Sequence, residues 1–156
     1  MRKRTRRKVW ALVNPIEHAM KGASVVLDRA QLSRQNWLLL DELRAGTMTL
    51  RPAFDRLTRA ILVGDRMRQF SLGREHLRTF EAAMAALNAI RDRKNDSGRD
   101  HYLASGPELQ ALRDALLVHD VQLEYAAVSE LQEAWRKLEA SEMTVQGAMR
   151  RRQQAA

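Results

Sequence analysis

The spacing of its apolar residues is the feature that most constrains how this chain can fold. Apolar side chains recur at intervals of three or four residues along most of the sequence, and no four-residue stretch alternates cleanly between apolar and polar outside these patterns. Only 7 of the 156 residues are Gly and only 3 are Pro, so the residues that most often interrupt helices are scarce. The sequence therefore predicts an all-α protein, folded as a compact bundle of five to six helices with basic, flexible termini.

Capping residues and glycines indicate where the first helices begin and end. The Asn14-Pro15 pair favours the start of a short helix that Gly22 would end. A broad apolar stripe predicts a central helix from residue 24 or 28 to Ala45. Thr49 is expected to cap a third helix.

The later helices follow from similar signals. Gly73 would separate the third helix from a fourth, and Gly64 lies inside the third helix either as a close helix–helix contact or as a weak point. The charged stretch 91–100 is predicted to be a loop. Two capping boxes, Ser105-x-x-Glu108 and Ser129-x-x-Gln132, predict a fifth helix to about residue 126 and a sixth toward residue 149.

Positive charge is concentrated at the two ends of the chain. The 27 Lys and Arg residues against 19 Asp and Glu residues give a net charge of +8, yet the chain without its terminal basic clusters sums to −1. We therefore expect a basic N-terminal arm (1–10), a single helical domain (11–149) and a basic C-terminal tail (150–156). Within the domain, residues 51–78 sum to +4 and residues 105–142 to −5, an asymmetry that can orient a partner or a second copy.

The N-terminal arm contains the densest cationic run and is the main candidate binding site. A guanidinium matches the geometry of a phosphate, and a cationic arm gains affinity by displacing counterions from nucleic acid. An acidic protein partner and a solvated tail that aids solubility are the alternatives. Trp10 can stack on a base, although an aromatic that pins the arm to the core is the favoured interpretation. The predicted nucleic-acid contacts are Arg2, Lys3, Arg4, Arg6, Arg7, Lys8 and Trp10.

A secondary basic surface is a weaker candidate. Charge runs of this kind are most often ordinary solvated helix faces, and that remains the favoured interpretation here. The residues concerned are Arg56, Arg59, Arg66, Arg150, Arg151 and Arg152.

Signals for catalysis or metal binding are weak. The chain has no Cys, and its histidines share no ligand spacing, so we expect no metal and no cofactor. Phosphate-loop, dinucleotide-binding and nucleophile-elbow motifs are missing from the sequence, which favours a non-enzymatic protein. His119 lies on an apolar helix face beside Asp120, where a hydrogen-bonded core or interface histidine is favoured over a catalytic one. No apolar run approaches the roughly 20 residues that span a bilayer, so a cytoplasmic protein with no membrane partner is expected.

Four segments of the sequence are similar to segments of known proteins: the basic start leading into Asn-Pro-Ile-Glu-His-Ala (14–19), Glu-Leu-Gln-Ala-Leu (108–112), His-Asp-Val-Gln-Leu-Glu (119–124) and Ala-Ala-Val (126–128). They resemble a family of short, mostly uncharacterised helical proteins from phages and prophages of proteobacteria. The resemblance covers most of the chain, but residues 24–100 match only loosely. It implies a phage-linked accessory role and supplies no catalytic residue.

These observations lead to two expected functions. The first is a non-enzymatic phage-type accessory protein that binds nucleic acid or a nucleoprotein complex through the arm. The second is a protein-directed inhibitor or adaptor acting on a host defence or transcription complex, with a host protein as partner. A homodimer is also open, because the run Trp37-Leu38-Leu39-Leu40 could belong to the core or to a dimer seam.

Overall fold

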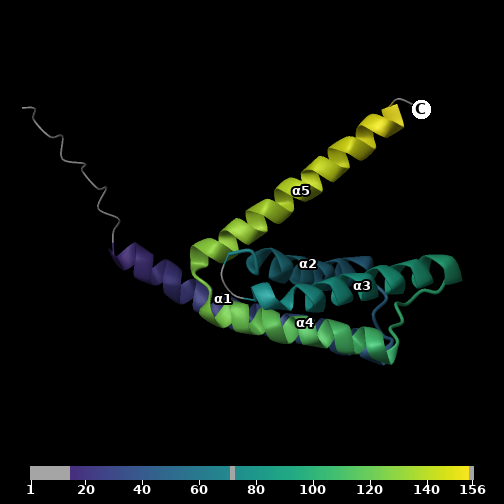
Figure 1. The fold of residues 1–156 in the computed structure, drawn as a ribbon, viewed down its shortest axis with the longest axis horizontal. Coiled ribbons are helices and arrows are strands. Elements are labelled where there is room, and N and C mark those ends of the chain that lie inside the picture. Colours follow the sequence, from purple (N-terminus) through teal and green to yellow (C-terminus); the bar gives the residue numbers. More distant parts are fainter. Residues whose placement is uncertain (1–14, 71–72, 155–156) are drawn as a thin grey trace, which may run out of the picture.

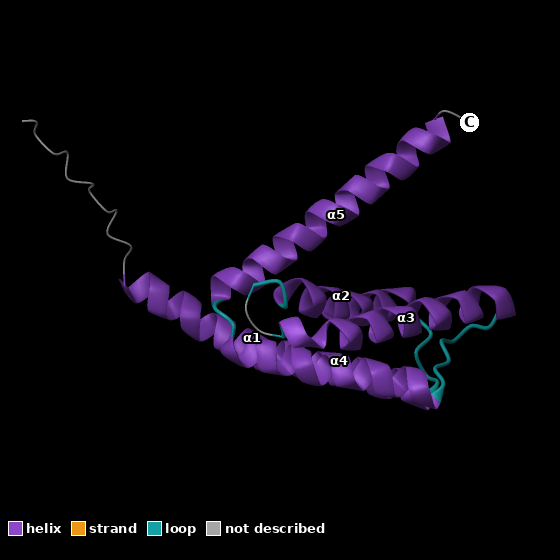
Figure 2. Ribbon diagram, in the orientation of Figure 1, coloured by secondary structure: helices purple, strands orange, loops and turns teal. Residues whose placement is uncertain are grey.

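The computed structural model describes the backbone of residues 15–70 and 73–154 and the side chains of residues 29–70 and 73–141. Within these ranges the chain forms five α-helices, one short 3-10 helix and no strand, which confirms the all-α prediction (Figures 1 and 2). The elements are α1 (Pro15–Ala45), α2 (Arg51–Met67), η1 (Arg74–His76), α3 (Leu77–Ser97), α4 (Gly106–Tyr125) and α5 (Val128–Gln154).

The first four α-helices pack together as a bundle, and the fifth is placed differently. α4 contacts both α1 and α3, and α2 contacts α1, α3 and α4. α5 packs mainly on α2 and then extends away from the other helices (Figure 1). The bundle predicted from the sequence is therefore confirmed, with α5 attached to it at one end.

Two apolar clusters form the interior. The larger cluster contains residues from each of the helices α1, α2, α3 and α4. It includes the fully buried side chains of Leu57, Ile61, Phe80, Ile90 and Leu116. Each such side chain contributes about 1.5–3 kcal/mol through removal of apolar surface from water. The smaller cluster lies where α5 meets α2 and the end of α4, and consists of Val63, Met67, Leu123, Ala126, Leu131, Ala134 and Leu138.

At Gly64 of α2, side chains from both α3 and α4 come close to the helix backbone. A Cβ atom at this position would lie 2.6 Å from Cε1 of the buried Phe80 and 3.3 Å from Oε1 of Gln122. Of the two interpretations of this glycine, the close helix–helix contact is confirmed.

Tyr102, in the loop before α4, contacts both the loop before α2 and the first turn of α2. Its ring stacks on Phe54 with centroids 4.3 Å apart, and its backbone N–H donates to the carbonyl oxygen of Met48 at 2.9 Å. Arg93 donates two hydrogen bonds to the Glu108 carboxylate, at 2.6 and 3.0 Å. The loop before α4 is thus held by both a ring contact and an ion pair.

Two predictions at the start of the chain were wrong. Gly22 does not end a helix, because α1 continues without interruption to Ala45. A single Gly inside a helix costs only about 1 kcal/mol relative to Ala, which the surrounding turns outweigh. The N-cap of α2 is Leu50 rather than Thr49.

Two later boundaries also differ from expectation. Residues 91–97 are helical, because α3 ends only where Gly98 adopts a left-handed backbone with φ of +62°. α5 begins at Val128, two residues before the predicted start, and its first turn is capped by Glu130, whose carboxylate accepts from the Ala127 N–H at 2.9 Å. The predicted box at Ser105 and Glu108 is confirmed, with the Ser105 N–H donating to Glu108 at 2.7 Å.

Candidate functional site

The predicted arm contacts and the C-terminal arginines fall outside the described side chains. Arg2, Lys3, Arg4, Arg6, Arg7, Lys8 and Trp10 precede the first described residue. Arg150, Arg151 and Arg152 lie on the backbone of α5, and their side chains are not among those described. Of the predicted basic residues, only Arg56, Arg59 and Arg66 of α2 therefore have side chains that the structure describes.

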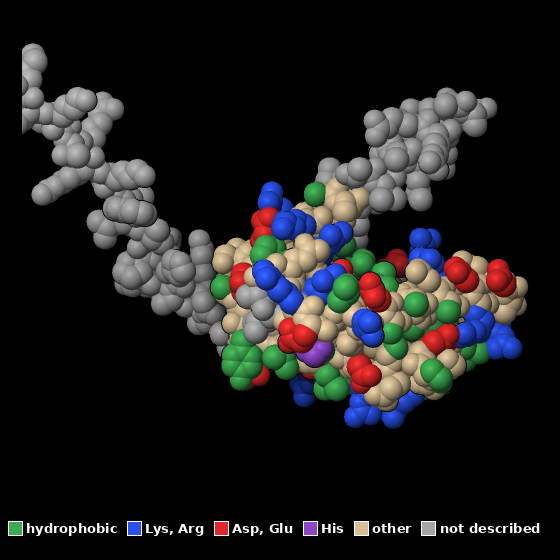
Figure 3. Space-filling model, in the orientation of Figure 1, with side chains coloured by type: hydrophobic (Ala, Val, Ile, Leu, Met, Phe, Trp, Pro, Cys, Tyr) green, Lys and Arg blue, Asp and Glu red, His purple; other side chains and the backbone are tan. Residues whose placement is uncertain are grey.

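The α2 arginines share one side of the helix but do not form a continuous cationic stripe. Arg56 and Arg59 are exposed and line the same cavity, whereas Arg66 is half-buried in the last turn. On the face of the molecule in Figure 3, Lys and Arg side chains lie among Asp and Glu side chains rather than in one block. The role of these arginines, as a solvated helix face or as a secondary basic surface, stays a prediction.

His119 belongs to a buried polar network that connects α4 to α2. Its side chain is 3% exposed, and its Nδ1 lies 3.4 Å from Oε1 of Gln122. The amide nitrogen of Gln122 donates to the Gly64 carbonyl oxygen at 3.1 Å, which leaves Oε1 as the atom that accepts. This assignment puts the ring proton on Nδ1 of His119 and a lone pair on Nε2.

Burial also fixes the charge of this histidine. Desolvation lowers the pKa of His119 below its usual 6.5, against the smaller raising effects of Gln122 and Asp120, so the ring is neutral at pH 7. The favoured interpretation of His119 as a hydrogen-bonded core residue is confirmed. Its partner is Gln122 rather than the adjacent carboxylate.

Asp120 instead connects α4 to α1. Its Oδ2 accepts a hydrogen bond from Nε1 of Trp37 at 2.6 Å, and its Oδ1 is buried without a hydrogen-bond partner among the described residues. Of the run that contains Trp37, Leu40 is buried and Leu39 packs partly against the core, whereas Leu38 is 56% exposed. Most of this run thus belongs to the core, and the homodimer stays a prediction.

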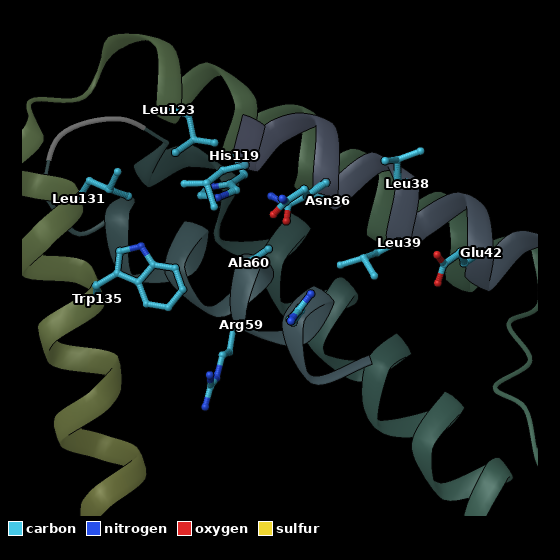
Figure 4. A pocket seen from close by; sticks show the side chains of 13 residues that line it. Asn36, Leu38, Leu39, Glu42, Arg59, Ala60, His119, Leu123, Leu131 and Trp135 are labelled. Atoms are coloured by element: carbon cyan, nitrogen blue, oxygen red, sulfur yellow. The ribbon is translucent and has the colours of Figure 1, made fainter. Parts of the chain in front are cut away.

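A cavity of about 380 Å³ opens between α1, α2, α4 and α5 (Figure 4). Apolar side chains from all four helices form most of its wall, with Trp135 of α5 on one side. The lining residues are Leu32, Gln35, Asn36, Leu38, Leu39, Glu42, Arg56, Arg59, Ala60, His119, Leu123, Leu131 and Trp135.

Two of the lining residues bring buried polar groups to this cavity. Asn36 is only 7% exposed, and in the described part of the chain its carboxamide makes no hydrogen bond. His119 contacts Gln122 through Nδ1, which leaves Nε2 outside that hydrogen bond. Figure 4 shows both side chains among those that line the cavity, Asn36 from α1 and His119 from α4. Among the described residues, the fully buried side-chain atoms without a partner are Nε of Arg29 and Oδ1 of Asp120, so the polar atoms of Asn36 and His119 are accessible from the cavity.

Sequence reasoning missed both Asn36 and Gln122, although a signal for them exists. Asn36 falls on the apolar stripe of α1, four residues after Leu32 and four before Leu40. Gln122 falls on the apolar stripe of α4 in the same way, next to Leu123. A polar residue on an otherwise apolar helix face is the pattern that identifies such positions.

The outer face of α4 carries a row of exposed apolar side chains. Leu117 and Val121 are each 50% exposed and Tyr125 is 69% exposed. Their spacing of four residues places them on one side of the helix, where Asp114 also lies. We refer to Leu117, Val121 and Tyr125 as the α4 row.

Searches for other kinds of site and for relatives gave no further assignment. Among the side chains described, no group of three or more His, Asp or Glu residues could hold a metal ion. The described helices include none that is long and apolar enough to cross a membrane. Comparisons with protein-family models, curated proteins and solved structures found no match to this chain.

Proposed function

We propose that this chain is a non-enzymatic, phage-type accessory protein that binds nucleic acid or a nucleoprotein complex through Arg2 to Lys8. The observation that carries the proposal is the presence of six basic residues among the first eight. The arm is also the densest cationic run of the sequence, whereas charges of both signs are mixed on the face of the bundle in Figure 3, and both observations support the proposal. Contacts of this kind bind the phosphate backbone and do not select a sequence.

The proposal is tested by neutralising the arm in the full-length chain. A variant with all six arm residues changed to Gln is compared with wild type for binding to duplex DNA and to RNA by fluorescence anisotropy over a range of salt concentrations. If all six residues engage duplex phosphates, wild type has a log–log salt slope of about −5, which the variant loses. A matched control changes Arg150, Arg151 and Arg152 to Gln. Equal affinity and equal salt slope for wild type and the arm variant would contradict the proposal.

A second candidate function is a protein-directed inhibitor or adaptor acting on a host defence or transcription complex. The α4 row favours it, because three large apolar side chains aligned on one helix face are typical of a protein contact. Asp114 on the same face suits a partner whose apolar patch has a basic edge.

The two functions are separated by a pull-down from nuclease-treated proteobacterial lysate. The adaptor function predicts a stoichiometric protein partner that survives nuclease and is lost with Val121→Asp, but is kept by the arm variant. Ala89→Asp, on an exposed position of α3, is the control. Loss of every partner after nuclease treatment, or equal capture by the Val121 variant, contradicts it.

A further inference from the structure

We propose that the cavity between α1, α2, α4 and α5 binds a compact, mainly apolar molecule that carries one hydroxyl group at its buried end, such as a small phenol or alcohol. This site is independent of the arm and goes beyond nucleic-acid binding.

The size and wall of the cavity suit a small organic molecule. Its volume of about 380 Å³ lies in the range of ligand pockets, which begins near 300 Å³. Leu39, Leu123 and Leu131 provide apolar contact, and the indole of Trp135 provides a flat surface for a ring. Such a wall favours an apolar body in the ligand.

The buried end of the cavity defines the polar group of the ligand. The lone pair on Nε2 of His119 accepts one hydrogen bond, and the carboxamide of Asn36 can donate another. A hydroxyl group can donate to the imidazole and accept from the amide, so the proposed ligand bonds to both side chains through one hydroxyl group. Because the His119 ring is neutral, this end of the cavity offers no charge to an anion.

The exposed residues of the cavity wall carry both signs of charge. Arg56 and Arg59 are cationic, and Glu42 is anionic. Cationic and anionic side chains therefore share the rim, and recognition falls to the buried end. A neutral ligand is the one that these surroundings fit.

The polar network behind the cavity keeps the acceptor in place. Gln122 holds Nδ1 of His119, and the Gly64 carbonyl oxygen fixes the orientation of Gln122. The proton position on the ring is thus set from the side opposite the ligand. Because the proton is held on Nδ1, Nε2 of His119 can accept a hydrogen bond from a ligand but cannot donate one.

The test uses three matched probes with the full-length protein. They are 4-propylphenol, propylbenzene, which lacks the hydroxyl, and 4-propylanisole, whose ether oxygen only accepts. Amide and indole resonances of the ¹⁵N-labelled protein are followed during titration with each probe. We expect 4-propylphenol to bind roughly three- to tenfold more tightly than the other two, as for one or two added hydrogen bonds. The shifts should centre on the residues around the cavity, including the indole N–H of Trp135.

Two variants locate the site and its polar end. Asn36→Ala should reduce the advantage of the phenol over propylbenzene, whereas Ala60→Leu should weaken all three probes by filling the cavity. Asn95→Ala, at an exposed position of α3, is the control and should leave binding unchanged. The proposal is overturned if wild type binds none of the probes up to their solubility limits, if it binds the three equally, or if the shifts lie away from the cavity. The comparison of the three probes needs only the wild-type protein. It can therefore refute the proposal even if a variant does not fold.

Discussion

The ring of Phe80 occupies the space next to Gly64 that a larger residue would need, since a Cβ atom on Gly64 would lie 2.6 Å from Cε1 and 2.9 Å from Cζ of that ring. Phe80 is fully buried in the larger cluster, so the ring cannot turn aside without disturbing its neighbours. The relationship fixes how closely α2 and α3 approach each other.

Gly64→Ala is expected to destabilise the protein by about 1–3 kcal/mol, because the overlap with Phe80 outweighs the better helix propensity of Ala. The measurement is urea unfolding followed by circular dichroism. Gly106→Ala is the matched control, since nothing lies within 4 Å of a Cβ there, and its stability should change by less than about 0.5 kcal/mol. A Gly64→Ala variant as stable as wild type would show that α2 and α3 can separate at no cost.

The ion pair between Arg93 and Glu108 predicts a loss of stability in acid. Hydrogen bonds from the Arg93 guanidinium, with further bonds from Ser105, lower the pKa of Glu108 to about 2 from its usual 4.5. Because the pKa is lower in the folded state, the pair stabilises the protein fully above about pH 4.5. That contribution disappears as the pH falls from about 4.5 to about 2.

Arg93→Gln should therefore lower the urea midpoint at pH 7 and have little effect near pH 2. Arg136→Gln serves as the comparison, because Arg136 pairs with Glu133 on the exposed surface of α5. Exposed pairs contribute little, so its effect at pH 7 should be smaller. A difference between wild type and Arg93→Gln that does not change with pH would contradict the assignment.

The hydrogen bond from Trp37 to Asp120 is expected to stabilise the contact between α1 and α4. Trp37→Phe removes the donor and leaves the carboxylate of Asp120 without a partner, which should cost about 1–3 kcal/mol. Adding Asp120→Asn to this variant removes the unpaired charge and should recover part of the loss. Urea unfolding followed by circular dichroism measures both, and the coupling between the two positions comes from the double-mutant cycle. Strictly additive effects would show that the two side chains do not interact.

Tyr102 is expected to act through its ring and not through its hydroxyl. Tyr102→Ala removes the stack on Phe54 and should destabilise the protein by about 3–5 kcal/mol, as for other buried aromatic truncations. Tyr102→Phe keeps the ring and should cost less than about 1 kcal/mol. Thermal unfolding compares the two variants with wild type. Equal losses for both variants would assign the stabilisation to the hydroxyl.

The sequence predicted the fold class because helical periodicity is a local property. Gly98 and the Ser105 cap also act locally, and the helix ends at these two residues follow from backbone conformation and short-range hydrogen bonds. The error at residues 91–97 came from treating dense charge as a loop signal. In the structure the last turns of α3 carry Arg93, which is held by a residue 15 positions away.

The cavity could not be predicted in the same way. Its wall depends on how α5 lies against α2 and α1, which single-helix patterns do not encode. Asn36 and Gln122 interrupt apolar stripes, so their positions could have been recognised as unusual. What each one faces became clear only from the packing of helices far apart in sequence.

The attachment of α5 has a consequence for local opening of the protein. α5 is held on α2 mainly by Leu131, Ala134 and Leu138 of the smaller cluster, while the larger cluster does not depend on it. We expect α5 to open as a separate cooperative unit. The free energy of opening obtained from hydrogen exchange should be lower for the amides of α5 than for those of α2, α3 and α4. Because Leu131 and Trp135 form part of the cavity wall, detachment of α5 dismantles the cavity. A bound molecule would therefore slow hydrogen exchange along α5 by mass action.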